Sequence, residues 1–140
     1  MAKPFQFRLR TLLLAFVPVA FVALLVGWGL RRPLPVPVSG TVTLNGKPLI
    51  GAQVTFFPIE PIDPSGRSAG GQTDGTGAFR LASGAFQGSY GVAIVNGFNQ
   101  PPAPRGRVVP VRYQNTATSD LTAEVSSGPN DFTFNLTSVP

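Results

Sequence analysis

Two runs of alternating apolar and polar residues lie on either side of Asn45-Gly46, and this pattern constrains the fold more than any other feature of the chain. The apolar members of the first run share one parity, and they are Val36, Val38, Val42 and Leu44. Such alternation places apolar side chains on one face of a strand. Asn and Gly both accept positive φ, so they suit the type I′ turn of a hairpin. The pattern predicts strands at about 36–44 and 52–58, with Lys47-Pro48 closing the turn.

Composition indicates many short strands. The 140 residues include 16 Gly and 15 Pro, which argues against a helical bundle. Five further segments are predicted as strands, and they are 67–73, 78–82, 89–96, 120–126 and 131–137. The residues expected to face inward along the later strands are Val54, Phe56, Phe79, Leu81, Tyr90, Val92, Ile94, Leu121, Ala123, Val125, Phe132, Phe134 and Leu136. Seven short strands separated by turns predict an all-β fold, a seven-stranded antiparallel β-sandwich or an open barrel.

Three turns are expected to have a purely structural role. Asn45 and Gly46 form the first, and Thr73-Asp74-Gly75-Thr76-Gly77 joins the third and fourth strands. Ser127-Gly128-Pro129-Asn130 predicts a hairpin between the last two strands. Asp74 and Gly77 also permit a second interpretation, because an aspartate followed three residues later by a glycine resembles part of a calcium loop. The second aspartate and the closing glutamate of such a loop are missing, so a structural turn is preferred.

Residues 11–30, TLLLAFVPVAFVALLVGWGL, carry no charge. As a helix they would extend about 30 Å, the thickness of the hydrocarbon core of a bilayer. This predicts one N-terminal transmembrane helix that acts as a signal anchor. A cleaved signal peptide and a buried globular helix stay open as alternatives, although the apolar core is longer than a signal peptide requires and ends in Gly-Trp-Gly-Leu-Arg-Arg. Attachment through a lipidated cysteine is excluded, because the chain has no cysteine.

The net charge of +5 comes from the flanks of this apolar segment. The basic residues there are Lys3, Arg8, Arg10, Arg31 and Arg32, and from residue 33 onward acids and bases balance. Nucleic-acid binding is therefore discounted. The Lys/Arg bias favours a cytoplasmic N-terminus and a C-terminal domain in the periplasm or extracellular space. The predicted organisation is a basic flank (1–10), a transmembrane helix (11–30), a stiff Pro-rich spacer (31–37) and a domain over 38–140.

The chain offers few candidates for catalytic residues. The chain has no His and no Cys, so the common catalytic triads and an ordinary zinc site are excluded. Glu60 and Asp63 are the nearest pair of carboxylates, but the Pro-rich segment around them reads as a solvated turn. We therefore expect no catalytic residue, no metal and no cofactor.

Residues 97–111, GFNQPPAPRGRVVPV, are predicted to form a long exposed loop, because four prolines remove strand donors. A plain surface connection is the simpler interpretation. The alternative is a partner site, since guanidinium groups on an extended backbone can bind anionic groups. Its candidate residues are Phe98, Arg105, Arg107 and, just beyond, Tyr113.

Three stretches, VSGTVTLNGKPLIGAQVTFFP, TDGTGAFRLASG and GSYGVAIV, resemble the carboxypeptidase regulatory-like domain of the transthyretin-like (prealbumin-like) superfamily. The resemblance covers about residues 36–137 and implies a transthyretin-like or Ig-like sandwich of short bacterial envelope proteins. It implies an accessory domain and not the catalytic domain of metallocarboxypeptidases. The framework positions that it assigns are Gly40, Gly46, Gly51, Asp74, Gly77 and Phe79. Many proteins of this kind carry a lipidated cysteine, and here the apolar helix would replace the lipid.

Two classes of function follow. The preferred one is a non-catalytic module, anchored by a single span, that binds or braces another envelope protein. The alternative is a carbohydrate-binding module, because members of the superfamily bind glycans. Exposed aromatic platforms typical of sugar sites are scarce, with only Phe86, Phe98 and Tyr113 outside the predicted core.

Overall fold

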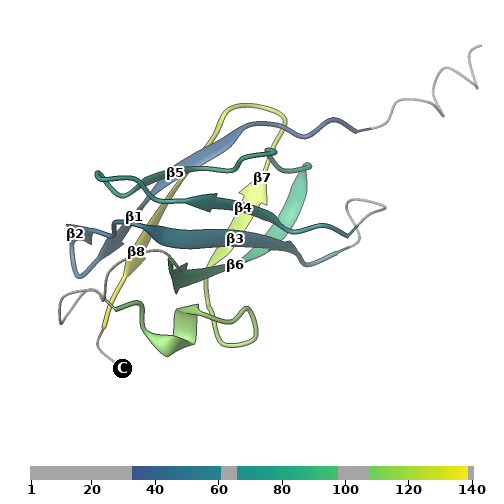
Figure 1. Ribbon diagram of the computed structural model, residues 1–140. Coiled ribbons are helices and arrows are strands. Elements are labelled where there is room, and N and C mark those ends of the chain that lie inside the picture. Colours follow the sequence, from purple (N-terminus) through teal and green to yellow (C-terminus); the bar gives the residue numbers. More distant parts are fainter. Residues whose placement is uncertain (1–32, 61–65, 98–107, 139–140) are drawn as a thin grey trace, which may run out of the picture. The chain divides into compact units, whose positions relative to one another are not determined.

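The structure of the protein is a computed structural model, and it describes residues 33–60, 66–97 and 108–138. Residues Leu34–Pro140 belong to one compact unit. Its described part is all-β, with two sheets and one short 3-10 helix (Figure 1). The elements are β1 (Val38–Leu44), β2 (Lys47–Pro48), β3 (Ala52–Pro58), β4 (Ala69–Gln72), β5 (Ala78–Arg80), β6 (Gly88–Asn96), η1 (Val111–Tyr113), β7 (Thr122–Val125) and β8 (Asn130–Leu136).

The two sheets have different internal orders. In the first sheet β1 is central, with β8 along one edge and with β5 and then β2 along the other. The second sheet has the order β4-β3-β6-β7, and all of its ladders are antiparallel. The β3·β6 ladder is its longest, from Ala52↔Asn96 to Pro58↔Tyr90. In Figure 1 the second sheet lies across the view in front of β1 and β8.

The core lies between the sheets and follows the predicted alternation. Val38, Val42 and Leu44 of β1 are buried against Val54 and Phe56 of β3 in a single cluster. Four rings surround Phe56, whose side chain is fully buried, at centroid distances of 5.9–6.2 Å. These rings belong to Phe79, Tyr90, Phe132 and Phe134. Aromatic side chains each bury a large apolar area, so this cluster dominates the packing of the sandwich.

The Asn45-Gly46 turn has the geometry of a tight hairpin, but its second arm is short. Both φ angles are positive, 53° and 79°, and the pairs Thr43↔Pro48 and Leu44↔Lys47 flank the turn. The buried side chain of Leu49 then ends this arm, and the chain crosses to the other sheet. The expected pairing of 36–44 with 52–58 is therefore wrong: β1 and β3 face each other across the core.

The hairpin predicted at 127–130 is wrong for a similar reason. β7 pairs with β6 in the second sheet, whereas β8 pairs with β1 in the first, so the connection crosses between the sheets. The buried side chain of Asn130 closes this connection, accepting a hydrogen bond from the Ser126 amide and donating to the carbonyl groups of Ser126 and Gly128. These local bonds satisfy backbone groups that a hairpin would have paired across its strands.

The expectation of a wholly antiparallel, seven-stranded sandwich also needs correction. β1 and β8 run parallel through seven residue pairs, from Val38↔Asn130 to Leu44↔Leu136. Parallel pairing follows from the crossing before Asn130, because β8 starts beside the start of β1. Among the described residues, the two-residue strand β2 raises the number of strand segments to eight.

The described end of the predicted loop, residues 108–111, is not simply exposed, and the chain that follows it to residue 121 packs against the sandwich. Val109 and Tyr113 are 1% and 4% exposed, and Ala93, on the outer side of β6, is also buried. Ser119 donates a hydrogen bond from its hydroxyl to the Val92 carbonyl at 2.7 Å. This segment therefore covers part of the outer face of β6. Gly91 has no side chain on that face, and Thr116 lies next to it. The remainder of the predicted loop, 98–107, lies outside the described residues.

The expected transmembrane helix at 11–30 also lies outside the described residues. Within the part of the chain that the structure describes, no helix has the length and apolar character needed to span a membrane.

Candidate functional site

Of the residues predicted for a partner site, only Tyr113 lies within the described part of the chain. Phe98, Arg105 and Arg107 lie outside it. Tyr113 was a candidate for an exposed ring, and the structure corrects this because the side chain is buried within the core cluster. The ring is therefore not available as a platform for a ligand, and the hydroxyl group already accepts hydrogen bonds from neighbouring residues.

Those neighbours join η1 to the end of β8. The Arg112 guanidinium donates to the Tyr113 hydroxyl, to the Thr137 carbonyl at 3.0 Å and to Thr137 Oγ1 at 2.6 Å. It also lies 4.5 Å from the centre of the Tyr113 ring, a cation–π distance. Burial raises the pKa of Tyr113, but hydrogen bonds with Thr137 and the charge of Arg112 outweigh it, so the pKa lies below 10.0. The cluster pins η1 to β8 and has a structural role.

The side chain of Asp74 stabilises its own turn through hydrogen bonds. Asp74 Oδ1 accepts from the Thr76 amide at 2.8 Å, the Thr76 hydroxyl at 2.7 Å and the Ala78 amide at 3.1 Å. These hydrogen bonds, led by that of the Thr76 hydroxyl, hold the pKa of Asp74 below its ordinary value of 3.8. Gly77 completes the turn with a φ of 78°. Within the described residues, no group of three or more acidic, His or Cys side chains lies close enough to hold a metal ion.

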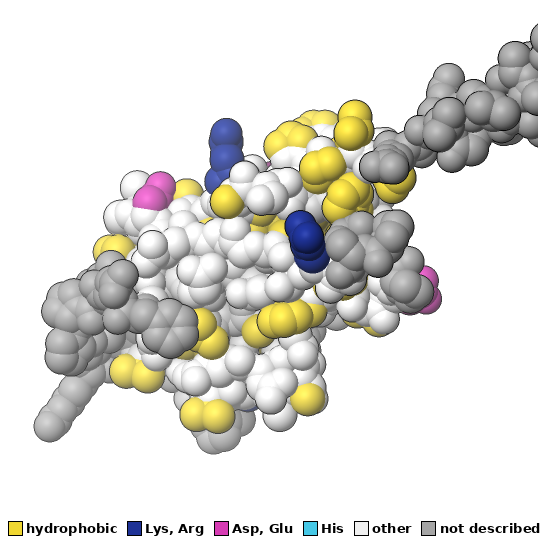
Figure 2. Space-filling view, turned by 45° about the vertical axis from the view of Figure 1, so that its right-hand side comes forward, with side chains coloured by type: hydrophobic (Ala, Val, Ile, Leu, Met, Phe, Trp, Pro, Cys, Tyr) yellow, Lys and Arg dark blue, Asp and Glu magenta, His cyan; other side chains and the backbone are white. Residues whose placement is uncertain are grey.

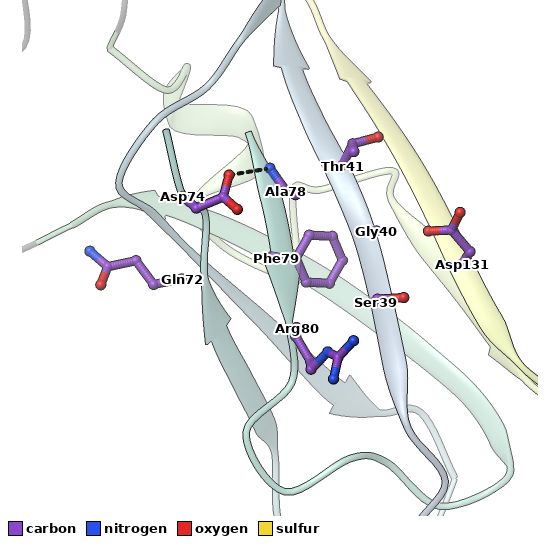
Figure 3. A pocket seen from close by; sticks show the side chains of 9 residues that line it. All are labelled: Ser39, Gly40, Thr41, Gln72, Asp74, Ala78, Phe79, Arg80 and Asp131. Atoms are coloured by element: carbon purple, nitrogen blue, oxygen red, sulfur yellow. Dashed lines mark hydrogen bonds between the residues drawn. The ribbon is translucent and has the colours of Figure 1, made fainter. Parts of the chain in front are cut away.

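A polar groove of about 520 Å³ runs over the outer face of the first sheet beside this turn. Figure 3 shows β1 in its middle, with Asp74 on the side of β5 and Asp131 on β8. Ser39 and Thr41 line the floor with hydroxyl groups, and Arg80 supplies a guanidinium. Because β5 and β8 pair with opposite edges of β1, the two carboxylates lie on opposite sides of the groove.

The chemistry of this groove is that of hydrogen bonding. Hydroxyl, guanidinium and carboxylate groups suit a ligand that carries several hydroxyl groups. The arrangement lacks the features of a sugar platform, because the only ring that lines it, Phe79, is 4% exposed. The groove is a candidate binding surface of modest depth.

Apolar side chains are exposed at both ends of the sandwich. We call one the spacer end, where residues 33–37 lead into β1, and the other the turn end, where the Asn45-Gly46 turn lies. At the spacer end Leu34 and Ile59 are 78% and 61% exposed. A hollow of about 450 Å³ lies at the same end, and its lining includes Pro35, Arg67 and Phe86. Figure 2 shows hydrophobic side chains gathered in its upper right, where the chain leads into the sandwich.

The turn end carries its own exposed apolar group. Ile50 is 44% exposed, Val108 is 53% exposed and Val111 is 80% exposed. The Val109 amide donates to Asn96 Oδ1 at the end of β6, which places 108–111 beside the same edge. Gly97, at the end of β6, also lies at the turn end, close to the Gly51 carbonyl group.

Sequence reasoning did not select these exposed residues, although a signal was present. Ile50 and Ile59 lie in turns, next to residues that are polar or conformationally special. Phe57 is out of phase with buried Phe56 and is 41% exposed. An apolar residue such as Phe57, which breaks the period of its strand, faces away from the core and indicates a surface site.

Comparison with known proteins adds no name to these features. No protein-family model, no curated protein and no solved structure matches the chain.

Proposed function

We propose that this chain is a non-catalytic module, anchored in the cytoplasmic membrane by residues 11–30, that binds or braces another envelope protein on the outer side. The observation that supports it is the exposed apolar group at the turn end, made by Ile50, Val108 and Val111. Exposed apolar side chains that gather at one end of a small domain are a feature of protein-binding sites.

The sequence beside this group fits the same proposal. Phe98, Arg105 and Arg107 belong to the segment whose two ends lie at the turn end. Aromatic and arginine side chains are enriched where protein interfaces gain most of their binding free energy. The resemblance to carboxypeptidase regulatory-like domains supports an accessory role for the sandwich. The side chains described above hold turns and edges together, so they also favour binding over catalysis.

Photocrosslinking in cells tests this function. A benzophenone side chain is placed at Val111 in the full chain, and a matched one is placed at Thr133 on the outer face of the first sheet. We expect a reproducible protein adduct from position 111 that Ile50→Asp abolishes, and no such adduct from position 133. Equal capture at both positions, or none from a folded and membrane-inserted chain, would reject the protein-binding role of the turn end.

A carbohydrate-binding role is the second candidate, and the polar groove of the first sheet is the observation that favours it. Its hydroxyl groups and Arg80 match the hydrogen-bonding needs of a saccharide. A glycan array probed with the full chain in nanodiscs tests this role. Binding that is lost in Arg80→Ala and in Asp131→Asn, but kept in Asp120→Asn, would support it. Unchanged binding in the first two variants, or no binding, would exclude the groove.

A further inference from the structure

We propose that the spacer end of the sandwich rests in the interfacial region of the lipid bilayer, so that the turn end points away from the membrane. The contact residues are Leu34, Phe57 and Ile59. This inference rests on the anchor in the proposed function, and it adds a second, weaker membrane contact that orients the domain.

The contact residues come from separate segments that the fold brings to one end. Val36 pairs with Ala85 in an isolated bridge, which fixes the chain after Leu34 against the segment before β6. The Ile59 amide donates to the Ser89 carbonyl at 3.0 Å, so the end of β3 lies beside the start of β6. The hollow lined by Pro35, Arg67 and Phe86 lies between these segments. Three separate connections thus present apolar side chains around one edge of the sandwich.

The length of the spacer favours lipid as the occupant of this surface. Only residues 31–37 separate the apolar segment from the domain. Val36 already pairs with Ala85, so residues 31–35 are the part that can separate the two, and in an extended polyproline II conformation they span about 16 Å, at about 3.1 Å per residue. A domain of this kind cannot move far from the bilayer, and the end that carries the spacer is the end nearest to it. A soluble protein partner would have to fit into this narrow gap.

Tethering allows a small apolar surface to remain in contact with lipid. Three partly exposed side chains would bind a membrane only weakly as a free domain. A short linker makes the contact intramolecular, with an effective concentration on the order of millimolar. The spacer end therefore needs only a slight preference for the interface to stay there.

Arg31 and Arg32 belong to the flank of the anchor, and the charges of the described residues around the contact itself do not favour an electrostatic mechanism. Arg67 and Glu60 are both exposed at this end and have opposite signs. Glu124, on the neighbouring strand β7, already accepts a hydrogen bond from Ser89. We therefore expect the contact to depend on apolar burial, with little effect of anionic lipid or of salt.

Spin labelling of the full chain in nanodiscs provides the test, because the natural sequence has no cysteine. A nitroxide is attached at Ile59→Cys or, as a matched control, at Val111→Cys. The nanodiscs contain phosphatidylcholine with or without phosphatidylglycerol. At position 59 we expect reduced collision with an aqueous nickel chelate and increased collision with oxygen, in both lipids. At position 111 we expect full access to the nickel chelate.

A second pair of variants separates orientation from folding. Leu34→Ser with Phe57→Ser should make a label at position 59 accessible to nickel, whereas Ile50→Ser should leave it protected. Equal nickel access at positions 59 and 111 in a correctly inserted chain would overturn the inference, as would protection only with anionic lipid. Flotation with vesicles after an alkaline wash reports on the anchor separately. A chain that fails to float contradicts the proposed anchor, and a chain that floats with an exposed position 59 contradicts only the lipid contact.

Discussion

The two sheets of this sandwich differ in the interactions that stabilise each of them. The second sheet has regular antiparallel ladders, and large apolar side chains of β3 and β6 fill the core beneath it. In the first sheet the central strand β1 pairs along its whole length with β8, which is far away in sequence, and the close approach of backbone and ring at Gly40 leaves no room for a side chain. We infer that β3 is sensitive to lost volume at Phe56, whereas β1 is sensitive to added atoms at Gly40 and β8 to lost closing hydrogen bonds at Asn130.

The largest effect is expected from the centre of the second sheet. Phe56→Ala removes the ring around which four other aromatic rings pack, and the cavity should cost about 4 kcal/mol of unfolding free energy. Phe57→Ala is the matched control on the same strand. Because Phe57 points outward, its loss should cost less than about 1 kcal/mol. Urea unfolding of the full chain in detergent, followed by circular dichroism, measures both, and similar losses would contradict a core centred on Phe56.

Adding one methyl group should distinguish the central strand β1 of the first sheet from β6 of the second sheet. A Cβ at Gly40 would lie 2.1 Å from the Phe132 carbonyl oxygen and 2.7 Å from the Phe79 ring, so Gly40→Ala should cost about 3 kcal/mol. A Cβ at Gly91 in the second sheet would meet only Thr116, at 3.8 Å. Gly91→Ala should be neutral or stabilise the fold by about 0.5 kcal/mol, because the unfolded chain loses freedom. Equal destabilisation by the two changes, in the same urea assay, would remove this distinction.

Loss of a closing side chain should have an intermediate effect on the first sheet. Asn130→Ala leaves the Ser126 amide and the Ser126 and Gly128 carbonyl groups without their partner, which should cost about 2 kcal/mol. Asn135→Ala, on the exposed face of the same strand, loses one hydrogen bond from Thr43 and should cost about 0.5 kcal/mol. Melting temperatures of the two variants test this ranking. If the Asn130→Ala variant were more stable than the Asn135→Ala variant, the connection between β7 and β8 would not depend on the hydrogen bonds of the Asn130 side chain.

The smallest expected effect concerns pH at the Asp74 turn. The pKa of this exposed carboxyl is lowered in the folded state, so its ionisation stabilises the fold above pH 3.8. That contribution should disappear as the pH falls below 3.8 and through the lowered value. Asp74→Asn keeps an acceptor oxygen without the charge, so its stability should change less than that of the natural protein over this acidic range. Parallel acid titrations at constant temperature would compare the two, and identical profiles would show that the turn does not depend on the charge.

The alternation of apolar residues predicted most of the strands and their buried faces. Val54, Phe56, Phe79 and Ile94 are all buried where the pattern placed them. Asn45-Gly46 likewise has the positive φ angles that its residue types favour. These features depend on neighbouring residues alone, so local chemistry was sufficient to predict them.

The candidate surfaces were less accessible to sequence reasoning. Tyr113 looked free because it follows a proline-rich stretch, yet Arg112 and Thr137 hold its hydroxyl inside the fold. Ile50 and Val111 form one exposed group at the turn end only because β3 and the segment after β6 meet there. Contacts between residues so far apart in sequence have no local signature.

The sequence by itself determined which segments are strands and which of their side chains are apolar and inward. Only the tertiary structure decided the sheet to which each strand belongs. Both sheets bury one face against the same core, so the period of a strand is identical whichever sheet it joins. The assignment of strands to sheets also sets the parallel pairing of β1 with β8 and the residues that meet at the two exposed ends. These contacts depend on where the chain crosses between the sheets and not on the pattern of any one strand.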